Sequence, residues 1–245
     1  MVCNALYDGK ASLYESAAGS ERYRAMELRT VLRATGPVAG RDILDLGCGT
    51  GWWGRQMLAR GARCVMGVDG TRDMLVEARR LSIAGGSRLI LAEGDIRTWS
   101  ADVPFHIVIA VWVLCHASTV HELTAMYRCA SSALPPNGQF VAVINNPAYR
   151  LDEGDGAAYG GRVIEQTACP DGHRIVYELA SSPPLRVVDH QWSAAAHQAA
   201  ARAAGFGKLS WVRLAPSSAE RAACPARFGD ELERNPFSVV IHCRA

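Results

Sequence analysis

Three aspartates each follow or end a short apolar stretch, and a glycine-rich segment adjoins the first of them. Asp45 opens the segment DLGCGTG, while Asp69 and Asp95 come at the ends of two later apolar runs. Glycine lets a backbone turn sharply or approach a ligand closely. A helix that begins after such a turn leaves unpaired N–H groups at its start. The pattern therefore predicts a strand, a loop and a helix that together hold a ligand.

The positions of the three carboxylates indicate which ligand this is. In a parallel α/β sheet the three strand ends lie along one edge, where such folds bind ligands. Asp69 suits a ribose diol, and Asp95 can accept a hydrogen bond from an adenine amino group. Asp45, beside the glycines, suits a cationic amino group and would repel a pyrophosphate. A ligand with an amine, a ribose and an adenine but no phosphate is S-adenosylmethionine (SAM).

The same glycines allow a second interpretation. Gly49, Gly51 and Gly54 satisfy the GxGxxG pattern of dinucleotide-binding folds, which would make the chain an NAD-dependent oxidoreductase. The first glycine of that pattern would then lie inside the turn and not at the strand end. A third interpretation, a turn that binds nothing, leaves the three carboxylates unexplained. SAM binding is the favoured hypothesis, and NAD binding is the alternative.

Four segments in order resemble motifs of the class I SAM-dependent methyltransferases, and the resemblance covers about residues 40–146. They are DLGCGTG at 45–51, GVDGTRDML at 67–75, EGDI at 93–96 and LPPNG at 134–138. The resemblance implies an α/β fold with a Rossmann-like seven-stranded sheet. It also implies an enzyme that transfers a methyl group (class EC 2.1.1), with SAM as cofactor and S-adenosyl-L-homocysteine as product.

The remaining segments supply the elements around this sheet. Alternating runs on either side of Asp171-Gly172 predict a small antiparallel β cap after the fifth strand, and such a cap would close over a substrate. The resemblance implies that the last strand, 237–243, runs antiparallel between strands five and six. The predicted parts of this single domain are a helical lid at 1–36, a SAM-binding core at 37–146, the β cap at 147–192 and the rest of the core sheet at 193–245.

The resemblance also implies which residues contact SAM. In this family the segment before the first strand folds over the cofactor, and the residue after the ribose carboxylate lines the adenine together with a nearby methionine. The expected cofactor-binding residues are Tyr14, Arg24, Asp45, Gly47, Gly49, Gly51, Trp53, Asp69, Gly70, Met74, Asp95, Ile96 and Val111. For Met74 and Tyr14, packing in the core is the alternative role.

His116 is the predicted catalytic residue. It lies in the turn after the strand 107–112, which faces the methyl-transfer centre in this family. Its imidazole could accept a proton from an N–H or O–H group near neutral pH. A histidine that caps the next helix or fills a polar gap is the alternative. The candidate substrate-binding residues are Tyr7, Trp112, Tyr149, Tyr159, Arg174, His190 and Trp192.

Scattered segments over most of the chain resemble one subgroup more closely, the toxoflavin-type N-methyltransferases of azapteridine antibiotic pathways. These segments include NPxYxL at 146–151, Tyr159-Gly160, the prolines at 183–184 and Trp192-Ser193. The resemblance implies N-methylation of a planar heterocycle in specialised metabolism. O- or C-methylation of another small natural product is the alternative.

Composition limits the partners of the chain. The 245 residues carry a net charge of +2, without a basic run that would indicate nucleic-acid binding. No apolar stretch is long enough to span a bilayer, and the start does not resemble a signal peptide. The eight cysteines lack metal-ligand spacing and suit a reducing compartment. We expect a cytoplasmic monomer or homodimer that acts on a small molecule, without nucleic acid, membrane or metal.

Overall fold

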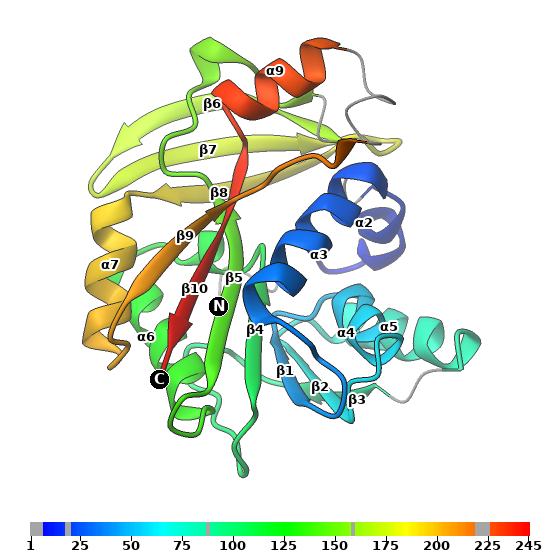
Figure 1. The fold of residues 1–245 in the computed structure, drawn as a ribbon. Coiled ribbons are helices and arrows are strands. Elements are labelled where there is room, and N and C mark those ends of the chain that lie inside the picture. Colours follow the sequence, from blue (N-terminus) through cyan, green and yellow to red (C-terminus); the bar gives the residue numbers. More distant parts are fainter. Residues whose placement is uncertain (1–6, 18–20, 87–88, 158–159, 219–225) are drawn as a thin grey trace.

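Two β-sheets and the helices around them make up the protein (Figure 1). This computed structural model describes residues 7–17, 21–86, 89–157, 160–218 and 226–245. A seven-stranded sheet lies at the centre, with helices on both faces, and a three-stranded sheet lies across one end of it. Among the described helices, none is both long and apolar enough to cross a membrane.

The central sheet has the strand order β3-β2-β1-β4-β5-β10-β9, and β10 runs in the direction opposite to the other six strands. The strands are β1 (Asp42–Leu46), β2 (Cys64–Asp69), β3 (Ile90–Glu93), β4 (Ile107–Val111), β5 (Gln139–Asn145), β9 (Leu209–Arg213) and β10 (Ser238–Arg244). The predicted seven-stranded sheet, with its last strand antiparallel between β5 and β9, is confirmed. All five residues of β4 are buried, as expected for a strand covered on both faces.

Helices cover this sheet and continue from its strands. They are α2 (Ala11–Ala17), α3 (Glu21–Thr35), α4 (Trp52–Leu58), α5 (Arg72–Ala84), α6 (Val120–Ser132), α7 (Ala194–Ala203) and α9 (Ala226–Arg234), with single 3-10 turns at η1 (Leu114–His116) and η2 (Leu151–Glu153). The α7 helix begins after Ser193, whose hydroxyl accepts a hydrogen bond from the Ala196 N–H and so satisfies one free donor of the first turn.

The second sheet is the predicted β cap, formed by β6 (Gly161–Cys169), β7 (Gly172–Leu179) and β8 (Leu185–Trp192). The turn between β6 and β7 has Asp171 at φ 61 and Gly172 at φ 156. In β8, Leu185, Val187 and Asp189 are buried in alternation with outward-facing residues. Because β8 lies against η1, this inward face reaches the ends of the central strands.

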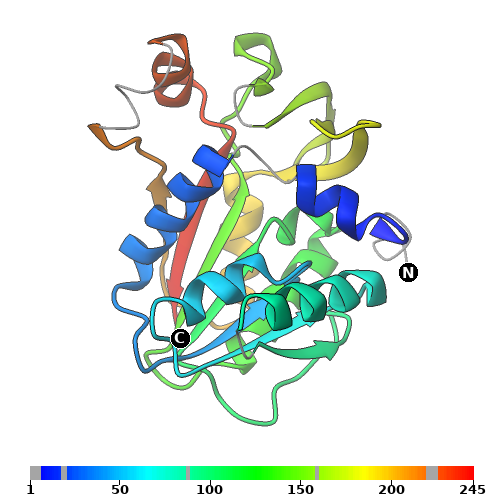
Figure 2. The same ribbon diagram turned by 90° about the vertical axis from the view of Figure 1, so that its right-hand side faces the viewer.

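The α2 helix joins the cap to the core, since it contacts both β8 and α5 (Figure 2). The Gly9 N–H donates a 2.6 Å hydrogen bond to Asp73 Oδ2 on α5. Glu15 of α2 accepts a hydrogen bond from the Thr50 hydroxyl in the glycine-rich loop. The segment before the first strand thus lies over the end of the sheet where the glycine-rich loop is found.

Candidate active site

The glycine-rich loop after β1 adopts left-handed backbone angles, with φ of 69, 53 and 76 at Gly47, Gly49 and Gly51. A Cβ on Gly47 would overlap Val113, and one on Gly51 would lie 2.7 Å from a Leu89 methyl group. A Cβ on Gly49 would meet nothing closer than Tyr14, at 3.9 Å. Gly49 is therefore the position where the loop faces open space and a ligand could approach the backbone.

Asp69, at the end of β2, holds the loop in this shape. Its two oxygens each accept a 2.8 Å hydrogen bond, from the Gly49 and Thr71 backbone N–H groups. Burial raises the pKa of this carboxyl, and the two backbone N–H groups oppose the shift. Because each carboxylate oxygen can accept more than one hydrogen bond, Asp69 retains capacity for two ligand hydroxyls.

A cavity at the carboxyl ends of the parallel strands has an outer and an inner compartment. The predicted cofactor residues that line the outer compartment are Tyr14, Gly47, Gly49, Asp69, Gly70, Met74, Asp95, Ile96 and Val111. Arg97 also lines it and donates to both oxygens of Asp95, with Nη2 2.5 Å from Oδ2, and these hydrogen bonds lower the pKa of Asp95. Arg97 also pairs with Glu122 at 2.7 Å, so the Asp95 end of the outer compartment contains a charge network that was not predicted from the sequence.

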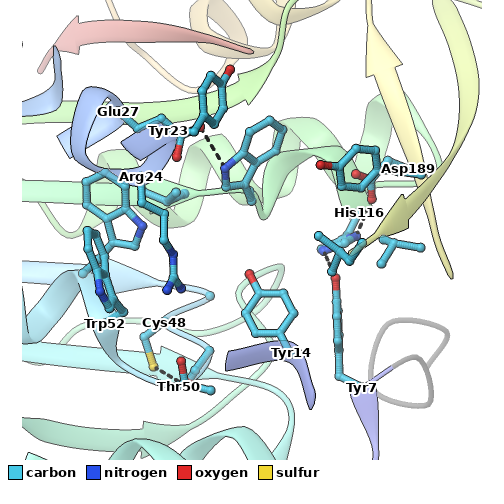
Figure 3. A pocket seen from close by; sticks show the side chains of 18 of the residues that line it. Tyr7, Tyr14, Tyr23, Arg24, Glu27, Cys48, Thr50, Trp52, His116 and Asp189 are labelled. Carbon is cyan, nitrogen blue, oxygen red and sulfur yellow. Dashed lines mark hydrogen bonds and ion pairs between the residues drawn. The ribbon is translucent and has the colours of Figure 1, made fainter. Parts of the chain in front are cut away.

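The inner compartment lies under the β cap and is lined largely by aromatic side chains (Figure 3). These are Tyr7, Tyr14, Tyr23, Trp52, Trp53, Trp112, Tyr177 and Phe237. Of these, Tyr7 and Trp112 are predicted substrate residues. The predicted cofactor residue Arg24 lines the compartment too. Both compartments share Tyr7, Tyr14, Gly47, Gly49, Val111, Trp112 and His116, so they adjoin at these residues.

His116 lies at this junction between Tyr7 of the N-terminal segment and Asp189 of the β cap (Figure 3). Its Nε2 is 3.3 Å from the Tyr7 hydroxyl, and its Nδ1 is 3.1 Å from Asp189 Oδ1 on β8. Burial disfavours the charged imidazole, but the negative charges of Asp189 and then Asp69 outweigh it and raise the pKa of His116. A histidine oriented by a carboxylate at one nitrogen can exchange a proton at the other.

Trp112 is held in an unusual backbone conformation beside this junction. Its φ of 56 lies in the left-handed region that large side chains avoid. The indole Nε1 donates a 3.1 Å hydrogen bond to Glu27 Oε1, and the ring stacks on Phe237 at 5.5 Å. These contacts fix the side chain that forms the wall between the two compartments.

Residues of α2 and α3 also converge on the loop. The Arg24 guanidinium lies 4.8 Å over the Trp52 ring, with Nη2 3.8 Å from Glu15 Oε2. Arg55 Nη2 is 3.5 Å from the other oxygen of Glu15. Burial raises the pKa of Tyr14 to about 12, which keeps its hydroxyl protonated. Tyr14 points into the pocket between Arg24 and His116 (Figure 3).

Two predicted cofactor residues do not line either compartment. Asp45 is 1% exposed, and burial followed by repulsion from Asp69 raises its pKa to about 8. Its Oδ2 has no hydrogen-bond partner among the described residues. Gly51 lies against Leu89, and its left-handed backbone angle forms part of the turn. Both residues therefore shape the loop from beneath.

Four predicted substrate residues likewise lie away from the two compartments. Tyr149 is buried and donates to the Gly154 carbonyl, and Arg174 pairs with Glu165 at 2.8 Å. His190 stacks on Trp192 at 5.2 Å, and Trp192 is buried in the core. Tyr159 lies outside the described residues.

The sequence analysis missed two charged residues that line the inner compartment, Glu27 and Asp189. The periodicity of its helix or strand places each one on a buried face. Glu27 shares the buried face of α3 with Tyr23 and Val31 at helical spacing. Asp189 alternates with Val187 on the buried face of β8.

Comparisons with known proteins agree with this geometry. Residues 43–138 match the methyltransferase domain family. The tRNA U34 carboxymethyltransferase of Cronobacter sakazakii is 34% identical over 110 residues, which are 44% of this chain and 34% of that protein. The chain thus spans about one third of the length of this curated relative.

Solved structures share the whole fold. An S-adenosylmethionine-dependent methyltransferase from Mesorhizobium loti has a TM-score of 0.64 at 22% identity, covering 92% of this chain and 99% of that one. CalS10, a SAM-bound amino pentose methyltransferase from Micromonospora echinaspora, has a TM-score of 0.62 at 20% identity and covers 94% of both chains. Residues 43–138 thus resemble a methyltransferase domain, and the chain has the fold of these solved SAM-dependent methyltransferases.

Proposed function

We propose that this protein is a SAM-dependent methyltransferase that methylates a nitrogen of a small planar heterocycle, of which an azapteridine is one example. The observation that carries the proposal is the pair of adjoining compartments at the strand ends. One has polar groups for a nucleoside, and the other has aromatic walls for a flat molecule. They meet at Tyr14 and His116, where a group could pass from one ligand to the other.

SAM is the cofactor, and the outer compartment fits it. Asp69 has acceptor capacity for the ribose hydroxyls, and Met74 and Ile96 offer apolar surface to the adenine. Gly49 leaves the loop open to close approach. The methionine part would continue past Gly49 into the inner compartment, where the Arg24 guanidinium suits its carboxylate. When bound, SAM supplies a methyl group on a positively charged sulfur. The SAM-bound solved structures of the same fold support this assignment.

The residues at the junction can align the acceptor nitrogen of the substrate and accept its proton. The acceptor nitrogen forms a bond to the methyl carbon while the carbon–sulfur bond breaks and its electron pair stays on sulfur. The proton of an acceptor N–H passes to His116 Nε2. Asp189 orients the ring at Nδ1 and stabilises the imidazolium that results. Tyr7, 3.3 Å from Nε2, occupies the position that a substrate N–H would take.

A nucleic-acid substrate is the second candidate, because one matched relative is by its name a tRNA enzyme. This match does not favour the expectation that the chain acts without nucleic acid. The test is release of S-adenosylhomocysteine from SAM with a panel of planar N-heterocycles and, separately, with total tRNA. We expect turnover with heterocycles alone and the new methyl group on nitrogen by NMR. Turnover with tRNA alone would contradict the small-molecule assignment, and methylation at oxygen or carbon would correct the acceptor.

A further inference from the structure

Glu27 is a buried carboxyl group at the end of the inner compartment away from His116. It is 2% exposed and lines the inner compartment but not the outer one. Its Oε1 accepts hydrogen bonds from Trp112 Nε1 at 3.1 Å and from Ser238 Oγ at 3.2 Å. No described residue donates to Oε2. Oε2 is therefore open to a donor that a ligand in the compartment could supply.

Two other carboxylates near this compartment each face a basic side chain. Asp189 faces His116 at 3.1 Å, and Arg24 faces Glu15 at 3.8 Å. Glu27 has no basic side chain within ion-pair distance in the described part of the chain, although Arg24 on the same helix lowers its pKa. Among the described residues that line this compartment, Glu27 is therefore the carboxylate that faces no basic side chain at ion-pair distance.

The walls beside Glu27 suit a flat cation. Tyr177 stacks on Phe237 with ring centroids 5.0 Å apart, and Trp112 stacks on the same ring at 5.5 Å. Burial, followed by the charge of Glu27, raises the pKa of Tyr177, so this ring stays a neutral phenol. Aromatic faces attract both planar groups and cations.

We propose that Glu27 is a substrate-binding residue and that the substrate presents a positively charged planar nitrogen group, an amidinium or a protonated amino-heterocycle, to its carboxylate. The inference rests on the proposed function and deepens it by naming the substrate class. Glu27 and His116 lie at opposite ends of the pocket (Figure 3). The group held by Glu27 is therefore an anchor, distinct from the nitrogen that receives the methyl group.

Binding of such a cation depends on pH. Burial raises the pKa of Glu27 to about 7, against the hydrogen bonds from Trp112 and Ser238 and the charge of Arg24. The carboxyl must be ionised to hold a cation, so the affinity falls about tenfold for each pH unit below about 7. Across the compartment, His116 also gains positive charge as the pH falls. The effect of pH on cation binding that remains in the Glu27→Gln variant therefore measures the contribution of His116.

The test uses the full chain saturated with S-adenosylhomocysteine, titrated with benzamidine and with benzamide. These probes have the same shape, but only benzamidine is a cation. At pH 8 we expect benzamidine to bind about ten- to a hundredfold more tightly, the range of a charge-assisted hydrogen bond. Glu27→Gln, which keeps an oxygen acceptor for Trp112, should abolish both this preference and its pH dependence. Glu165→Gln should keep the preference, because it changes an exposed carboxylate that lines neither compartment.

The outcomes separate this inference from the proposed function. If S-adenosylhomocysteine does not bind, the proposed function fails. If it binds but benzamidine has no advantage over benzamide, or binds too weakly to measure, the role of Glu27 is overturned alone. A preference that survives in a Glu27→Gln protein that still binds S-adenosylhomocysteine would also overturn it.

Discussion

Asp69 is the single residue on which the cofactor assignment depends most. Asp69→Ala removes the acceptor for one backbone N–H of the glycine-rich loop and one of the turn after β2, together with the expected acceptor for the ribose. SAM affinity should fall by about 1–3 kcal/mol, the usual cost of stranding hydrogen-bonding groups. Calorimetric titration with SAM measures this. Glu93→Ala, an exposed carboxylate beside Asp69 in the sheet register, is the control that should change nothing. Equal affinity in the two variants would refute the ribose assignment.

The pair of His116 and Asp189 makes a kinetic prediction. Because neutral His116 is the base, turnover should rise as the pH rises through its pKa, which the charge of Asp189 raises against the effect of burial. Asp189→Asn removes the main charge that stabilises the imidazolium, so the rise should move to lower pH. His116→Ala should lower turnover by about 10²–10⁴-fold with little effect on SAM affinity. A parallel loss of SAM affinity would mean that His116 serves the cofactor site or the fold.

At the scale of elements, α2 is expected to act as a lid. Glu15 joins it to the loop through Thr50 and to α4 through Arg55. Glu15→Ala removes these links, so S-adenosylhomocysteine should dissociate several-fold faster, consistent with the loss of about 1 kcal/mol. Stopped-flow displacement measures the rate, with the exposed Asp152→Ala as control. An unchanged rate would show that α2 does not retain the ligand.

The β cap makes a stability prediction. Gly172 has φ 156, and a Cβ there would overlap the Gln191 carbonyl oxygen on β8. Gly172→Ala should destabilise the fold by about 1–3 kcal/mol, as overpacking does. Thermal unfolding compares it with Gly207→Ala, where a Cβ would meet nothing within 4 Å. Equal melting temperatures for the two variants would contradict the tight packing of the turn.

For the whole molecule, the sheet and the outer compartment could be predicted because their signals are local. Each strand, its glycines and its aspartate lie within a few residues of one another. The inner compartment could not be predicted, because its walls come from elements that are far apart in the sequence. Glu27 and Ser238, for example, are hydrogen-bonded although they are 211 positions apart. Trp192 misled the sequence analysis because alternation in a strand does not say which face meets a cavity. The boundaries of the lid, core and cap, the cytoplasmic location and the monomeric or homodimeric state stay predictions.

The most direct test of the account is a thermal-shift series with SAM, S-adenosylhomocysteine and NAD. A ligand at about a hundred times its dissociation constant stabilises the folded state by roughly 2.7 kcal/mol. For a chain of this size that is about 5–10 °C. The account predicts this shift with both sulfur ligands and none with NAD. A shift with NAD alone would mean that the glycine-rich loop holds a dinucleotide, and it would contradict the role assigned to Asp69.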